Sequence, residues 1–255
     1  MKRDGVFRVT QEKASLGEQA LSKAAKVGIT TQLDAVEQLD VDIRTDPVKA
    51  VQGRVDSVAI DATGMVMQKD LRMEEMHLQT GKIAVNPLSV AFGKIELTHP
   101  TEATSQVILT EEDLNRAFNS DYIHGKLQNL SVHLDDRPTK VNVQAVELHL
   151  LGDCQLSLKA SVLIQETQER KKVCFTATPR VKEGGTGVVL EDVQYPDDQP
   201  RFSPELTQAL LEKASDLLDL QNFELPGMKL TLNHMDVEPG RLILQADALV
   251  EQFPS

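Results

Sequence analysis

The glycine-rich segment Gly184-Gly185-Thr186-Gly187 is the stretch whose composition most suggests phosphate chemistry. Such a loop cradles a phosphate only when a helix N-terminus follows it directly, because the backbone N–H groups there point at the anion. Here Val188-Val189-Leu190 follows, which favours a strand. The segment is therefore interpreted as a hairpin connection, and no cofactor is expected.

The six histidines do not form a metal site by their spacing, since no two are placed like ligands on one helix face. The most suggestive arrangement is His133 near Asp135 and Asp136. Because Asp135-Asp136-Arg137-Pro138 is typical of a turn, surface histidines are the simpler interpretation, and no metal is expected.

Nucleophilic catalysis needs an activated serine or cysteine beside a base. No serine stands in a Gly-x-Ser-x-Gly pattern, and Cys154 and Cys174 fall within expected strands. If residues 166–170 form a hairpin turn, Cys174 lies opposite about Leu163, so a disulfide is disfavoured and both thiols are expected to be reduced and partly buried. The acidic triplet Glu111-Glu112-Asp113 is explained by a helix start. No enzyme is expected.

The charge balance argues against nucleic acid as a partner. The chain has 27 basic and 39 acidic residues, a net charge of −12, whereas non-specific nucleic-acid binding neutralises phosphates with Lys and Arg. Two local basic runs are candidate contacts with lipid head groups: Lys2, Arg3 and Arg8 beside Val6 and Phe7, and Arg170, Lys171 and Lys172 on an expected hairpin tip.

Two features of the sequence predict a cytoplasmic location. No apolar run approaches the roughly 20 residues that span a bilayer, and the first residues lack the apolar stretch of a secretory signal. Peripheral contact with a membrane surface is compatible with both of these sequence features.

The elements that position these residues are mainly strands with one apolar and one polar face. The alternation is clearest at Leu156, Leu158, Ala160, Val162 and Ile164. Residues 228–232 and 242–250 repeat it around Glu238-Pro239-Gly240, which predicts a hairpin. Val141-Val143-Ala145 changes phase to Val146-Leu148-Leu150, which predicts a bulge.

Three segments favour helix. The first covers residues 16–39, although Gly28 and the β-branched residues after it weaken it. The second covers residues 111–119 with Thr110 as N-cap, and the third covers residues 204–220 with Ser203 as cap. Residues 1–15 are expected to form a flexible basic tail and residues 16–253 a single domain.

Four segments in order carry a family resemblance: Glu37-Gln38-Leu39-Asp40-Val41, Gly53-Arg54-Val55-Asp56-Ser57-Val58, Leu71-Arg72-Met73-Glu74-Glu75-Met76, and Val107-Ile108-Leu109-Thr110-Glu111-Glu112-Asp113-Leu114-Asn115. The sequence resembles the LmeA-like family of bacterial phospholipid-binding proteins, especially its cyanobacterial-type members, from about residue 18 to 252. Its most specific part is the Leu-Thr-Glu-x-Asp-Leu-Asn pattern that begins at Leu109.

The resemblance implies a tubular lipid-binding (TULIP/BPI-like) fold of the α+β class, mostly β, in which a long helix packs against a strongly curved antiparallel sheet. A groove between them would take acyl chains of a phospholipid or glycolipid. The family shares no catalytic motif, so no site residue is carried over.

The candidate lining of such a groove comes from inward-facing strand positions and the first helix. Its members are Leu21, Leu33, Val58, Ile60, Leu230, Leu232, Leu242 and Leu244. The predicted function is non-enzymatic binding of phospholipid or another glycerolipid, with exchange at a membrane surface as an option. One alternative is a scaffold whose core is filled by its own side chains, and another is a hydrolase acting on a lipid-linked substrate. The oligomeric state is left open.

Overall fold

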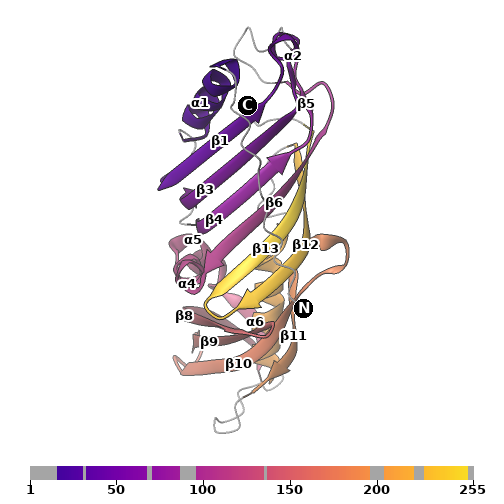
Figure 1. Ribbon diagram of the computed structural model, residues 1–255. Coiled ribbons are helices and arrows are strands. Elements are labelled where there is room, and N and C mark those ends of the chain that lie inside the picture. The colour runs from indigo at the N-terminus through magenta and orange to yellow at the C-terminus, as the bar shows by residue number, and fades with distance from the viewer. Residues whose placement is uncertain are drawn as a thin grey trace.

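Most of the described chain forms antiparallel β-strands, as the alternating apolar residues predict. The computed structural model describes residues 16–30, 33–67, 71–86, 96–134, 137–195, 204–220 and 227–251. Its strands form a six-stranded sheet, a five-stranded sheet and a short two-stranded pair. Figure 1 shows the six-stranded sheet above the five-stranded one, with helices at their edges and ends.

The six-stranded sheet is strongly curled and has the spatial order β1-β3-β4-β6-β13-β12. Its strands are β1 (Gln38–Arg44), β3 (Ser57–Met67), β4 (Leu71–Thr80), β6 (Thr101–Thr110), β13 (Arg241–Val250) and β12 (Met228–Glu238). The predicted C-terminal hairpin is confirmed, because β12 and β13 pair antiparallel on either side of Pro239 and Gly240. Sheet pairing thus brings the end of the chain beside β6.

The five-stranded sheet has the order β11-β10-β9-β8-β7. Its strands are β7 (Leu130–Leu134), β8 (Arg137–Gly152), β9 (Gln155–Ile164), β10 (Arg170–Val181) and β11 (Val188–Gln194). The predicted bulge is confirmed by a register shift between Val143 and Ala145. The glycine-rich segment forms the connection from β10 to β11, which contains the short helix η1 (Glu183–Gly185).

The helices are α1 (Leu16–Thr30), α2 (Pro47–Val51), α4 (Glu111–Phe118), α5 (Asp121–Lys126) and α6 (Pro204–Leu217), and the two-stranded pair is β2 (Arg54–Val55) with β5 (Ile83–Ala84). Thr110 is the N-cap of α4, as predicted, and forms a capping box with Asp113. Ser203 and the expected tail over residues 1–15 lie outside the described residues.

The helix predicted over residues 16–39 is wrong in its second half. The helix α1 ends at Thr30, and Gln38 already begins β1. Leu39, Val41 and Ile43 alternate with acidic residues and are buried, so period-two burial prevails over helix formation. Because α1 has 15 residues and packs beside the edge strand β1, the long helix implied by the resemblance is not confirmed.

The core consists of two apolar clusters, one over each sheet. The cluster of the five-stranded sheet includes Leu206 and Leu210 of α6, and that of the six-stranded sheet includes Ala25 and Ile29 of α1. Leu114 packs against both clusters, so the interior is continuous between the sheets.

Both cysteines are free, as expected, but two details of the prediction are wrong. Cys174 lies opposite Lys159 rather than Leu163, because Arg170 is already paired with Leu163. Cys154 is exposed rather than partly buried, since it occupies the turn between β8 and β9 with a positive φ of 59°.

Candidate functional site

One face of the six-stranded sheet is apolar across all its strands. Residues that are directly opposite on neighbouring strands point to the same face, with Cβ atoms about 5 Å apart. Two rows cross the whole sheet in this way: Val41, Ile60, Leu78, Ser105, Ala246 and Leu232, and next to it Leu39, Ala62, Met76, Val107, Leu244 and Met235. We call this surface the apolar face.

The margins of the apolar face are covered, whereas its middle is partly open. At one margin Leu39 and Val41 are 5% exposed beneath α1. At the other margin Leu232 is 3% exposed, and Met235 beside it is half-buried. The larger side chains between them, on β3, β4, β6 and β13, are only half-buried: Ile60, Met76, Leu78, Val107 and Leu244. A continuous row of half-buried aliphatic side chains leaves apolar surface against which further apolar atoms can pack.

Ser105 is the polar side chain in the middle of these rows. Its hydroxyl donates a hydrogen bond of 3.2 Å to the carbonyl of Ala246, directly across the strand pair. A hydroxyl whose proton is already used on the backbone costs less to cover with hydrocarbon. The row therefore remains compatible with an apolar ligand.

Six of the eight predicted lining residues meet on the apolar face. They are Val58, Ile60, Leu230, Leu232, Leu242 and Leu244, on β3, β12 and β13. Leu33 packs in the same cluster but lies after α1, not on it. The side chain of Leu21 lies outside the described residues.

The sequence interpretation missed the contributions of β1, β4 and β6. The alternation Leu39-Asp40-Val41-Asp42-Ile43 was the signal for β1, and it was hidden by the overlong helix. On β4 and β6, Leu78 and Val107 were missed because nothing in the local sequence places these two strands between β3 and β13.

The predicted membrane-contact residues Arg170, Lys171 and Lys172 are exposed at the start of β10. Lys171 forms an ion pair of 3.6 Å with Glu169. They belong to the five-stranded sheet, so the structure does not bring them together with the apolar face.

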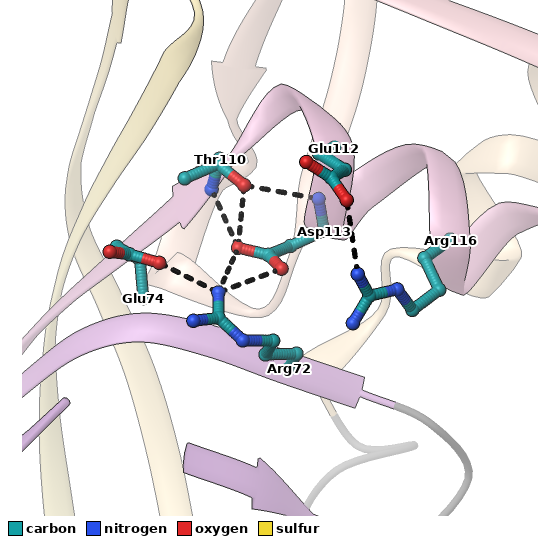
Figure 2. Close-up of a pocket in the computed structure, with 6 residues that line it drawn as sticks. All are labelled: Arg72, Glu74, Thr110, Glu112, Asp113 and Arg116. Atoms are coloured by element: carbon teal, nitrogen blue, oxygen red, sulfur yellow. Dashed lines mark hydrogen bonds and ion pairs between the residues drawn. The ribbon is translucent and has the colours of Figure 1, made fainter. Parts of the chain in front are cut away.

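A polar hollow of about 380 Å³ lies where β4 meets α4 (Figure 2). Arg72 Nη1 lies 2.6 Å from Glu74 Oε2 and 3.0 Å from Asp113 Oδ1, and Asp113 is 2% exposed. Arg72 Nη2 also reaches Glu37 Oε1 at 3.0 Å. The hydrogen bonds that Arg72 donates to Glu74, Glu37 and Asp113 raise the pKa of its guanidinium above its usual range.

Beside this hollow, Arg72 and its three carboxylate partners form a structural clamp. The hollow itself is unsuited to an anionic head group. The guanidiniums of Arg72 and Arg116 line it together with the carboxylates of Glu74, Glu112 and Asp113, and Glu37 pairs with Arg72 as well, so the local charge is already negative. The clamp joins Asp113, in the first turn of α4, to β4 and to the segment before β1. A second hollow of about 590 Å³, between α1 and the edge of β1 and β3, is also lined mainly by polar side chains, including Asp40, Asp61 and His77.

The helix α4 completes the edge of β8. Leu150 N–H donates to Glu111 Oε2 at 2.8 Å, and Asn115 bonds both the N–H and the carbonyl of Leu148, each at 2.8 Å. Asn119 bonds both groups of Val146 in the same way. The three side chains are spaced four residues apart, a rise of about 6 Å along a helix, and their backbone partners on β8 are spaced two residues apart, about 6.6 Å along a strand. The two spacings therefore match.

The most specific part of the family pattern is therefore explained by structure. Thr110 and Asp113 cap α4, Glu111 and Asn115 bond the edge of β8, and Leu114 joins the two clusters.

His149 lies beside this edge between two carboxylates. Its Nδ1 is 3.0 Å from Glu111 Oε1 and its Nε2 is 2.8 Å from Glu147 Oε1. Hydrogen bonds to Glu111, first, and to Glu147 raise the pKa of His149 above 6.5, because only the protonated ring can donate to both carboxylates.

The ranges that the structure describes contain neither a metal-binding cluster nor a membrane-spanning helix. There, no group of three or more His, Cys, Asp or Glu side chains is arranged to hold a metal ion. Among the helices of these ranges, none combines the length and apolar character that crossing a bilayer requires.

The fold thus combines a strongly curled antiparallel sheet with an apolar, partly open face. A comparison with known protein families assigns the chain to one of them. The profile of the family described as LmeA-like phospholipid-binding matches residues 13–247, so the chain belongs to the LmeA-like phospholipid-binding family. No curated protein and no solved structure matches the chain.

Proposed function

We propose that the protein binds the acyl chains of a phospholipid, or of another glycerolipid such as a glycolipid, against the apolar face of its six-stranded sheet and performs no reaction on them. The observation that carries the proposal is the row of half-buried aliphatic side chains that crosses β3, β4, β6 and β13. Membership of a phospholipid-binding family supports the ligand class.

The physical chemistry favours exchange over extraction. Each CH₂ group removed from water contributes about 0.8 kcal/mol, so an acyl chain of about 16 carbons gains on the order of 12 kcal/mol. A lipid that leaves a bilayer gains almost none of this, because its chain is already dry. The protein would therefore shield the chain between two membranes or membrane sites.

The experiment compares two adjacent residues of β13 that point to opposite faces. Leu244 lies on the apolar face opposite Val107, whereas Ile243 lies on the other face opposite Ile108. Both are half-buried, so an aspartate should cost similar stability at either position. Organic extracts of purified wild-type, Leu244→Asp and Ile243→Asp proteins would be measured by mass spectrometry against a mock preparation.

We expect stoichiometric glycerolipid with the wild-type and Ile243→Asp proteins and a severalfold loss with Leu244→Asp. The Ala246→Trp variant covers the middle of the same face without adding charge, and it should lose lipid as well. A lipid-free wild-type extract, with no uptake from labelled vesicles afterwards, would favour a scaffold with a self-filled core. Conversion of the added lipid would instead favour a hydrolase.

A further inference from the structure

The two most exposed large apolar side chains of the described residues lie on one helical turn. Val48 is 67% exposed and Val51 is 83% exposed, three residues apart on α2, so they project from the same side of the helix. Single exposed apolar residues are common, but a pair on the outermost turn forms a small apolar tip. Figure 1 places α2 at the end of the molecule away from the five-stranded sheet.

Three side-chain interactions hold this helical turn in place. The Asp46 side chain accepts a hydrogen bond from the N–H of Val48 at 2.8 Å, and Lys49 pairs with Asp56 at 2.9 Å. The buried Thr45 donates its hydroxyl proton to the carbonyl of Arg54 at 2.7 Å. Both valines are thus already exposed in the folded protein, before any contact with a partner.

The charge around the valines is close to zero, in contrast to the strongly negative charge of the whole chain. We call residues 46–56 and 81–86 the docking tip, which comprises α2, β2 and β5 with their connections. It carries three basic residues (Lys49, Arg54 and Lys82) and two acidic ones (Asp46 and Asp56), and Glu96 adjoins it through its backbone bond to Asn86, so the region is near neutral in a chain of net charge −12. Arg54 and Lys82 are exposed, and an exposed cation beside an apolar tip complements anionic lipid head groups.

The tip is continuous with the apolar face. β1 leads into α2 and β2 leads into β3, and Ile43 and Val58, one on each of these strands, are directly paired. Val55 at the tip packs in the same cluster as Val58 and Ile60. An acyl chain that leaves a bilayer at the tip would meet aliphatic side chains along its whole path to the middle of the sheet.

We infer that the docking tip is where the protein contacts a phospholipid bilayer, with Val48 and Val51 inserted among the acyl chains and Arg54 and Lys82 at the head groups. This goes beyond the proposed lipid binding, because it assigns the surface through which lipid is exchanged. It also differs from the predicted contact at Arg170, Lys171 and Lys172, which lies on the other sheet.

The chain has no tryptophan, so a single introduced indole reports on one position alone. The Val51→Trp variant would be titrated with vesicles of phosphatidylcholine and phosphatidylglycerol. We expect its emission to shift to the blue and to be quenched by bromine-labelled acyl chains. The matched control is Val27→Trp, because Val27 is also an exposed valine (59%) but lies on α1, and its emission should not change.

Vesicle flotation tests the same surface without a probe. The double variant Val48→Asp/Val51→Asp should bind these vesicles at least about tenfold more weakly than the wild-type protein. Lys82→Gln should weaken binding about fivefold, whereas Lys171→Gln should not change it. Because the substituted side chains are exposed, the variants should keep the fold, which far-UV circular dichroism would verify.

The inference is overturned if the wild-type protein does not float with these vesicles, or if it floats while the Val51→Trp emission stays unchanged. It is also overturned if Lys171→Gln weakens flotation and the double variant does not. These failures are separate from that of the proposed function, because lipid in the organic extract without vesicle docking removes only the docking tip. Docking without lipid in the extract removes only the acyl-chain site.

Discussion

The two sheets of this protein carry the same alternating pattern but bury it to different degrees. On the five-stranded sheet, Val162 and Val173 are 0% and 1% exposed, beneath a cluster to which α6 contributes Leu206. On the six-stranded sheet, α1 packs against β1 at the edge and α4 against β4 and β6. Met65, Met73 and Leu109 are buried there, but the larger side chains of the two rows across the middle of the apolar face remain half-buried. The apolar side chains of the five-stranded sheet are thus fully packed, whereas the six-stranded sheet keeps partly exposed aliphatic surface, where the proposed lipid would bind.

The sharpest test of this difference is one substitution made in each sheet. Leu158→Ala removes a side chain that is 8% exposed and faces Leu148 and Phe175, so it should lower the free energy of unfolding by about 2–5 kcal/mol. Leu78→Ala, on a half-buried residue of the apolar face, should cost less than about 2 kcal/mol. Urea denaturation of the delipidated proteins measures both. Equal losses would mean that the two sheets are equally closed.

A second comparison concerns the helices that complete the sheet edges. Asn115→Ala removes both partners of the Leu148 backbone, where Leu148 is 4% exposed, and should cost about 2–4 kcal/mol. Ser22→Ala removes one hydrogen bond of 3.0 Å from the N–H of Ile43 and should cost about 1 kcal/mol. If Ser22→Ala cost more stability than Asn115→Ala, α4 would not be the helix that stabilises its sheet edge more strongly.

Lipid should sharpen the contrast between the sheets. A ligand that binds only the folded state stabilises it by mass action, by about 2.7 kcal/mol at 100 times its dissociation constant. Calorimetry with added phospholipid should therefore raise the melting temperature of the wild-type and Leu158→Ala proteins. The increment should be smaller for Leu78→Ala, because that residue lies on the apolar face. A full increment with Leu78→Ala would exclude Leu78 from the contact.

The smallest expected effect is a dependence on pH near the edge of β8. Because the folded state raises the pKa of His149, its contribution to stability is fully present below pH 6.5 and disappears as the pH rises through the folded-state pKa. The side chain is 36% exposed, so solvent screening limits this contribution to less than about 1 kcal/mol.

Stability measured against pH for the wild-type and His149→Gln proteins would converge at high pH and separate at low pH. His133→Gln, on an exposed strand position, serves as the control for loss of an imidazole. A constant difference at every pH would contradict the ion-pair explanation.

Local features of the fold were predictable because they depend on neighbouring residues. The turn at Pro239 and Gly240, the bulge after Val143 and the cap at Thr110 each follow from a few adjacent side chains. The period-two pattern likewise placed Ile60 and Leu244 on inward faces. The end of α1 was misjudged because residues 33–39 contain apolar positions that suit either a helix or the start of a strand.

The openness of one sheet could not be predicted, since the alternating patterns of the two sheets are alike. What differs is which helix lies over each face, and that depends on contacts between distant segments. The bonds from Asn115 to Leu148 and from Arg72 to Asp113 join residues 33 and 41 positions apart. Nothing in the local sequence around Asn115 indicates that its side-chain amide will make the backbone hydrogen bonds that a neighbouring strand would otherwise make.

The most direct test of the central claim is to map where a bound acyl chain lies. The protein would be loaded with a phospholipid that carries a photoactivatable group near the end of one acyl chain, irradiated and digested, and the labelled peptides identified by mass spectrometry. We predict labelling on the apolar face, at residues of β4, β6 and β13 such as Leu78, Val107 and Leu244. Labelling confined to the five-stranded sheet, or to the face that carries Ile243, would contradict the account.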